Sequence, residues 1–117
     1  SSVQQSNEDL SGYKGITQVY KDVLKVTRNS VEHFKIKYMN PDNYSKKLSV
    51  ISSDPIIQVK NPTMSIGYKS SSYIRLKIIA PDTPAYYECF LGIRNLENNE
   101  MEEVEKIVID VLNDGEI

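Results

Sequence analysis

The sequence predicts an all-β domain in which two β-sheets pack face to face as a sandwich of seven strands. Apolar and polar residues alternate along several short runs, and this period of two buries one face of each strand against a second layer. Clusters of Asn, Asp, Ser, Gly and Pro separate the runs. The chain has eight tyrosines and no tryptophan, and tyrosine favours pleated, half-buried surfaces.

The clearest alternation extends from Ser72 to Leu112 and defines three strands. Their inward-facing residues are Ile74, Leu76 and Ile78 in the first, Cys89, Leu91 and Ile93 in the second, and Ile107, Ile109 and Val111 in the third. We expect the first two runs to be central strands and the third to close an edge of the sandwich.

Two strands are expected near the start of the chain. The apolar residues of 16–26 are irregularly spaced, so a helix is the alternative there, but the β-branched content and the turn residues 28–30 favour a strand. The next run, 31–39, alternates regularly: Phe34, Ile36 and Tyr38 face one way, and His33, Lys35, Lys37 and Met39 face the other. Pro41 ends this strand, since proline cannot donate to a ladder.

Shorter runs follow between proline-containing turns. Leu48 and Val50 mark one strand, Ile56, Ile57 and Val59 a second, and Met64 and Ile66 a third. After the runs of 72–79 and 86–94, residues 95–103 form a hairpin loop in which we expect a helical turn at 100–103. Asn113-Asp114-Gly115 ends the last strand.

A chain of 117 residues is long enough for one domain with one core. We assign residues 1–15 to a flexible leader, 16–113 to the sandwich and 114–117 to a C-terminal tail. No apolar run reaches the roughly 18 residues that a membrane helix needs. The single cysteine, Cys89, lies on the apolar register of its strand, and we expect a buried structural thiol in a reducing compartment.

Charge is unevenly distributed along the chain, although the formal net charge is only −2. Residues 14–77 hold 12 basic and 4 acidic residues, a net of +8, and residues 78–117 hold 2 basic and 10 acidic residues, a net of −8. The split forms two opposed patches if the halves lie apart, and it cancels if strands from the two halves interleave. The small net charge argues against nucleic-acid binding.

No set of residues indicates catalysis. His33 is the only histidine and falls on the polar register of its strand, so neither a zinc site nor a Ser-His-Asp triad is indicated. We therefore expect no enzyme activity, no metal or other cofactor, no small-molecule substrate and no membrane insertion. An enzyme whose site is completed by a partner or a neighbouring domain is the alternative.

Two clusters hold the candidate partner-binding residues. Lys35, Lys37, Lys46 and Lys47 lie on two consecutive strands, with Tyr44 nearby, and form a basic patch if those strands pair. Glu100, Glu102 and Glu103, in a run that also holds Glu97 and Glu105, form an acidic loop. Each cluster has a simpler interpretation as solvated surface charge. On that interpretation Glu102→Ala costs less than about 0.5 kcal/mol of stability, whereas Leu91→Ala in the core costs roughly 2 to 5 kcal/mol.

Several motifs occur in a characteristic order between residues 18 and 112. Phe34 begins Phe-Lys-Ile-Lys-Tyr-Met-Asn-Pro, Leu48 begins Leu-Ser-Val-Ile-Ser-Ser-Asp-Pro, Tyr73 begins Tyr-Ile-Arg-Leu-Lys-Ile, and Phe90 begins Phe-Leu-Gly-Ile-Arg-Asn before an acidic loop. In this order they resemble the major-sperm-protein-like (MSP, PapD-like) superfamily of immunoglobulin-like sandwiches. Within it they are most similar to the C-terminal domain of the nephrocystin-4 family of the ciliary transition zone.

The resemblance implies an immunoglobulin-like, seven-stranded, non-enzymatic domain that binds other proteins. It further implies a larger ciliary scaffold protein, located in the cytoplasm at the basal body and transition zone, and it carries over no catalytic residue. Some MSP domains of membrane-contact-site proteins bind acidic peptides through a basic strand segment, and residues 46–51 depart from that motif. Binding of an anionic lipid or an acidic peptide through the four lysines is the alternative function.

Overall fold

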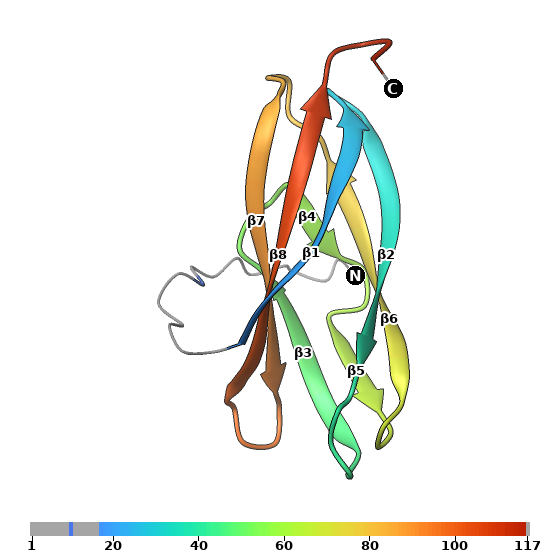
Figure 1. Cartoon of the computed structure of the whole chain (residues 1–117), viewed down its shortest axis with the longest axis vertical. Coiled ribbons are helices and arrows are strands. Elements are labelled where there is room, and N and C mark those ends of the chain that lie inside the picture. The colour runs from blue at the N-terminus through green and yellow to red at the C-terminus, as the bar shows by residue number, and fades with distance from the viewer. Residues whose placement is uncertain (1–9, 11–16, 117) are drawn as a thin grey trace, which may run out of the picture.

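The computed structural model describes Leu10 and residues 17–116, with the side chains of Leu10 and of residues 23–116. These residues form eight strands (Figure 1). The strands are β1 (Thr17–Thr27), β2 (Val31–Met39), β3 (Lys46–Ser52), β4 (Ile57–Val59), β5 (Thr63–Ile66), β6 (Ser71–Ile79), β7 (Ala85–Asn95) and β8 (Met101–Leu112). Within this described part, no helix is long and apolar enough to cross a membrane.

The strands form two sheets that pack face to face. One sheet has five strands in the order β1-β8-β7-β3-β5, and the other has three in the order β2-β6-β4. Neighbouring strands are antiparallel except β1 and β8, which run parallel. The all-β sandwich predicted from the alternating pattern is therefore confirmed.

The strand count differs from the predicted seven, which followed the number usual for such sandwiches. Every run with a strand pattern forms a strand of its own, including the two short ones, β4 and β5. Asn61-Pro62 separates these two, and they join different sheets, since β4 pairs with β6 and β5 pairs with β3. The irregular first run forms β1, a strand rather than a helix.

β8 is not the edge strand expected from the sequence. It lies between β7 and β1, because β1 adds to it in parallel from Thr17 opposite Glu103 to Thr27 opposite Leu112. Alternation shows which face of a strand is buried, and it does not show how many neighbours the strand has. The expected helical turn at 100–103 was also wrong, since residues 101–103 already belong to β8.

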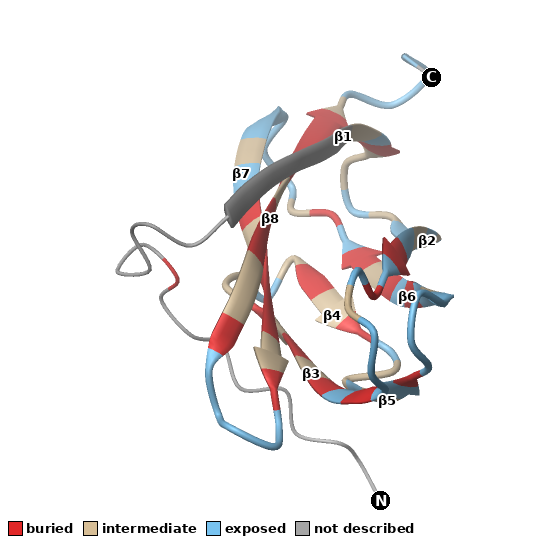
Figure 2. Cartoon of the chain, turned by 60° about the horizontal axis from the view of Figure 1, so that its bottom comes forward, coloured by how far each residue is buried: buried red, intermediate tan, exposed pale blue. Residues whose placement is uncertain are grey.

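The main core lies between the two sheets (Figure 2). The residues predicted to face inward from β6, β7 and β8 are at most 2% exposed. A smaller cluster lies on the opposite, outer face of the five-stranded sheet, where Leu10 packs with Met101 and Val104. Leu10 is the only described residue of the predicted flexible leader, and the rest of that leader lies outside the described residues. The surfaces left for binding are the outer sheet faces, the sheet edges and the loops.

Candidate functional site

The eight residues predicted to bind a partner lie in three separate places. Lys35 and Lys37 are on the outer face of the three-stranded sheet, whereas Lys47 is exposed on β3 of the other sheet. The other five surround one cleft at the end of the sandwich; they are Tyr44, Lys46, Glu100, Glu102 and Glu103. Because β2 and β3 do not pair, the four lysines do not form the single basic patch that their pairing would have produced.

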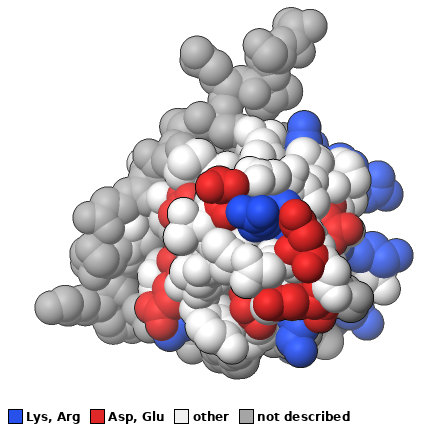
Figure 3. Space-filling view, turned by 90° about the horizontal axis from the view of Figure 1, so that it is seen from above, with Lys and Arg blue, Asp and Glu red and all other residues white. Residues whose placement is uncertain are grey.

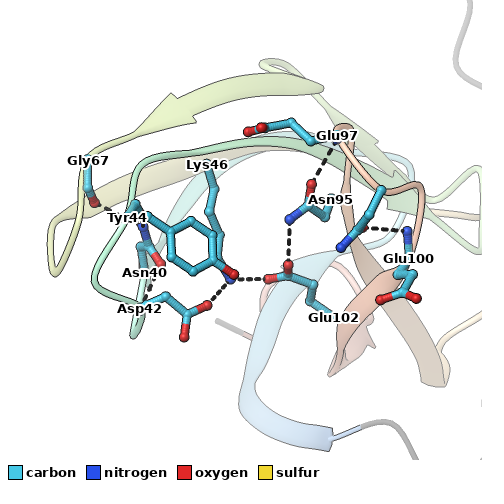
Figure 4. A network of polar contacts seen from close by, with 10 residues as sticks. Asn40, Asp42, Tyr44, Lys46, Gly67, Asn95, Glu97, Glu100 and Glu102 are labelled. Atoms are coloured by element: carbon cyan, nitrogen blue, oxygen red, sulfur yellow. Dashed lines mark hydrogen bonds and ion pairs between the residues drawn. The ribbon is translucent and has the colours of Figure 1, made fainter.

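Lys46 is held inside the cleft and is not a solvated surface lysine (Figure 4). Its side chain is 3% exposed, its Nζ lies 2.6 Å from Glu102 Oε1, and it forms a second ion pair with Asp42. The Tyr44 ring covers the ammonium at 5.4 Å from Nζ to the ring centroid. Glu102 lies on β8 rather than in a loop, and so does the fully buried Glu105. The interpretation as a solvated acidic loop was therefore wrong for Glu102 and Glu105, whereas Glu97 and Glu100 are exposed in the loop between β7 and β8.

Two buried asparagines connect this ion-pair cluster to the surrounding loops. Asn95 Nδ2 donates to Glu102 Oε2 at 2.8 Å. Asn40 Nδ2 donates to the carbonyl oxygens of Tyr44 and Gly67 at 2.9 and 3.1 Å. The β2–β3, β5–β6 and β7–β8 loops are thereby held at the same end of the sandwich (Figure 1). The arrangement explains why polar side chains are buried there, since each is satisfied by a neighbour.

The charged side chains of the cleft have a structural role. Burial by itself would lower the pKa of Lys46, but hydrogen bonds to Asp42 and Glu102 and their charges raise that pKa above its usual range. Burial, together with Glu103 and Glu102, raises the pKa of the nearby Tyr38 to about 12. The ion pairs of Lys46 with Asp42 and Glu102 compensate these charges inside the cleft. Among the described residues, no group of three His, Cys, Asp or Glu is placed to hold a metal ion.

A different surface, the outer face of the three-stranded sheet, carries a second group of cations. We call it the basic face and define it by Lys35, Lys37, Lys60, Arg75 and Lys77. Alternate residues of β2 and β6 point outward, and Lys60 follows β4 directly. None of these cations forms an ion pair with a carboxylate in the described part of the chain. The outward positions of the three strands hold no Asp or Glu.

Like charges lie next to one another on the basic face. Lys35 is directly opposite Arg75 in the β2–β6 ladder, and the Lys60 amide donates to the Arg75 carbonyl oxygen at 2.8 Å from the other side. Three cations thus follow one another across strands that are about 4.8 Å apart. Lys35 Nζ lies 4.5 Å from the centroid of the Tyr73 ring, and Lys60 Nζ lies 3.4 Å from His33 Nδ1. Like charges opposite each other destabilise a sheet, so a bound anionic group would relieve this repulsion.

The basic face has two shallow depressions. One is lined by His33, Phe34, Lys35, Lys60 and Arg75, and a neighbouring one by Lys60, Asn61, Ser71, Ser72, Tyr73 and Arg75. An end-on view shows several lysine and arginine side chains along one side of the molecule, while the end that faces the viewer carries several carboxylates around a central basic side chain (Figure 3). The charge split along the sequence is therefore only partly cancelled by folding.

Sequence reasoning found two members of the basic face and missed the other three. Lys35 and Lys37 were predicted to face outward, and the outward register of Arg75 and Lys77 was visible too. What was missing was the β2–β6 pairing, which brings residues about 40 positions apart into one surface. Lys60 joins through the β4–β6 pairing, for which the sequence shows no signal.

Comparison with known proteins yields matches only among solved structures, because no protein family and no curated protein matches this sequence. WR4, an MSP family member from Caenorhabditis elegans, matches with a TM-score of 0.57 and 8% identity, over 77% of this chain and 92% of that chain. PapD-like domain 7 of human CEP192 matches with a TM-score of 0.57 and 7% identity, over 80% of this chain and 81% of that chain.

A family 123 glycoside hydrolase from Clostridium perfringens also matches, with a TM-score of 0.58 and 11% identity. The match covers 81% of this chain but only 23% of the hydrolase chain. At such identities these likenesses show the fold alone. The fold is an MSP/PapD-like, immunoglobulin-like sandwich, as the sequence resemblance implied.

Proposed function

We propose that this domain is a non-enzymatic protein-interaction module that binds an acidic segment of another protein at the basic face. The observation that supports the proposal is a row of adjacent cations with no carboxylate among the outward positions of β2, β4 and β6. An anionic group that approaches this face would relieve the like-charge repulsion. The MSP and PapD-like fold neighbours agree with this reading but do not identify a partner.

Binding of a fluorescein-labelled oligoglutamate peptide, measured by fluorescence anisotropy, tests the charge requirement. We expect binding that weakens steeply with salt, because the Debye length falls from about 10 Å at 0.1 M to about 3 Å at 1 M ionic strength. The double variant Lys35→Glu, Arg75→Glu is expected to lose at least about tenfold in affinity. Lys47→Glu is the matched control, since Lys47 is an exposed lysine outside the basic face. No binding at low salt, or equal losses in both variants, would contradict the proposal.

The wider setting rests on the sequence resemblance alone. We propose that the domain belongs to a ciliary scaffold protein of the nephrocystin-4 type, located in the cytoplasm at the basal body and transition zone. The test is to tag the protein in ciliated cells and record its position and its co-purifying partners. Absence of the tagged protein from the ciliary base would rule out this setting and leave the binding proposal standing.

A second candidate function is contact with an anionic lipid surface. It is favoured by apolar side chains that lie exposed on the same outward register as the cations, at Val31, Met39 and Ile79. Basic and apolar groups together suit a membrane interface. Co-sedimentation with vesicles of phosphatidylcholine and phosphatidylserine, compared with phosphatidylcholine alone, tests it. Equal background with both compositions would eliminate lipid binding.

A further inference from the structure

The edge of β2 has no neighbouring strand in the described part of the chain, and its backbone groups are arranged to accept one. Among the described strands, β2 pairs with β6 alone. At the two ends of that ladder, Ala80 N donates to Ser30 O at 2.9 Å and Asn40 N donates to Ser70 O at 2.8 Å. Even-numbered residues of this segment therefore turn their N–H and C=O groups toward β6, because bonding direction alternates along an antiparallel strand.

The odd-numbered residues accordingly point their backbone groups away from β6, toward the open edge. They are Val31, His33, Lys35, Lys37 and Met39. The same residues send their side chains to the outer side of the sheet, and all five are exposed. An added strand would find a ladder of backbone donors and acceptors along the whole length of β2.

The two sides of this edge differ in chemistry. On the outer side lie His33, Lys35 and Lys37, next to Arg75. On the inner side, Phe34 and Ile36 pack against the core but are only partly buried. Residues directly opposite one another on neighbouring strands share a face. A partner strand would therefore need acidic residues on its outer side and apolar residues on its inner side.

A second copy of this chain does not fit the edge. Pairing β2 with another β2 would place lysines of both copies on one face, about 5 Å apart at directly opposed positions. Such like-charge contacts are one way in which natural sheets keep their edges from joining. Charge complementarity instead selects an acidic partner.

This inference rests on the proposed function. We propose that the acidic partner docks as an extended strand on the open edge of β2, and that acidic and apolar residues alternate along the partner strand. Main-chain hydrogen bonds to the odd-numbered residues hold the partner segment. The alternation determines which side of the added strand lies beside the cations. The affinity of the partner for the basic face therefore depends on the spacing of its carboxylates as well as on their number.

Peptides of the length of β2, nine residues, separate this inference from simple charge attraction. One peptide alternates Glu and Val, and a second has the same composition with its Glu and Val residues in separate blocks. We expect the alternating peptide to bind at least about tenfold more tightly, and we expect N-methylation of its alternate amides to remove binding. Equal affinity for the two peptides would overturn strand addition while leaving the basic face as a charge-dependent site. Failure of oligoglutamate to bind at low salt would overturn the proposed function as well.

Amide hydrogen exchange by NMR gives a direct readout of the edge. In the free protein the amides of His33, Lys35 and Lys37 should exchange quickly and those of Phe34 and Ile36 slowly. Binding of the alternating peptide should protect the first group. Protection of these amides before any peptide is added would overturn the inference, because the edge would then be occupied already. Unchanged fast exchange in a saturated complex would overturn it too.

Discussion

Lys46 on β3 and Glu102 on β8 form an ion pair, 2.6 Å from Nζ to Oε1, although 56 residues separate them and β7 lies between their strands. Asn95, at the end of β7, also donates to Glu102. Asp42 pairs with Lys46 from the loop between β2 and β3. The pair therefore joins three strands and one loop at the same end of the sandwich.

Glu102→Ala is expected to lower the free energy of unfolding by about 1 to 3 kcal/mol, because Lys46 remains buried with only part of its counter-charge. This reverses the expectation from the sequence, which treated Glu102 as a solvated residue. Urea unfolding measures the change. Glu100→Ala is the control, since Glu100 is exposed, and it should cost less than about 0.5 kcal/mol. Equal losses in the two variants would mean that the ion pair contributes nothing to stability.

Asn40→Asp should destabilise the fold by about 2 to 4 kcal/mol. Asn40 is fully buried, and its amide group donates to the carbonyl oxygens of Tyr44 and Gly67. A carboxylate would turn both contacts into repulsion between acceptors. The matched control is Asn43→Asp, an exposed position two residues beyond Pro41 in the same loop. Similar midpoints of urea unfolding for the two variants would contradict this role of Asn40.

Stability should fall as the pH rises above about 9. Burial, with a smaller contribution from Asp54, raises the pKa of Cys89 from 9.0 to about 12. Burial and Glu103 raise the pKa of Tyr38 from 10.0 to about 12. Above these ordinary values the unfolded chain releases protons that the folded chain retains. The free energy of unfolding therefore decreases, by up to about 1.4 kcal/mol per pH unit for each group.

Urea unfolding at a series of pH values measures that slope, and Cys89→Ala identifies one of its sources. The variant should show a flatter decline between the ordinary pKa values of Cys89 and Tyr38, 9.0 and 10.0. The contribution of Lys46 to stability is lost only at higher pH, because it is present below the ordinary lysine pKa of 10.5 and is lost above that value. An identical slope in the wild-type protein and the variant would show that the thiol is not protected from ionisation.

Gly92→Val should cost about 1 to 3 kcal/mol through overpacking on the outer face of the five-stranded sheet. A β-carbon at Gly92 would lie 2.9 Å from Met101 Sδ and 3.2 Å from Leu10 Cδ2. The cost should shrink in a Leu10→Ala background, where part of the space is vacated. A double-mutant cycle by thermal or urea unfolding measures this coupling. Strictly additive effects would show that Leu10 does not pack there in solution.

Leu91→Ala should cost roughly 2 to 5 kcal/mol, because the side chain is fully buried between the sheets. Tyr86, on the same strand, is 72% exposed, and Tyr86→Ala should change stability by less than about 0.5 kcal/mol. Thermal unfolding of both variants checks the inward register of β7. Comparable shifts would place Leu91 outside the core.

Alternation in the sequence was enough to assign faces within single strands. Ile74, Leu91 and Ile109 are buried as predicted, because the period of two in a strand is a local property of the backbone. The positions of the turns followed for a similar reason, since Pro, Asn and Asp act on the backbone next to them. Neither signal contains the identity of a strand's neighbours. For that reason the edge position expected for β8 was wrong, and the burial of Lys46 was not predicted, whereas Lys47 is exposed.

By itself, then, the sequence determined the all-β class, the inward residues and the chemistry available on each strand. Only the tertiary structure decided which strands lie side by side. That decision buried Lys46 against Asp42 and Glu102, and it assembled Lys35, Arg75 and Lys60 into one exposed row. The physical reason is that the energy of a charge depends on its distance from other charges and on its exposure to water. Both quantities are set by contacts between residues far apart in the chain.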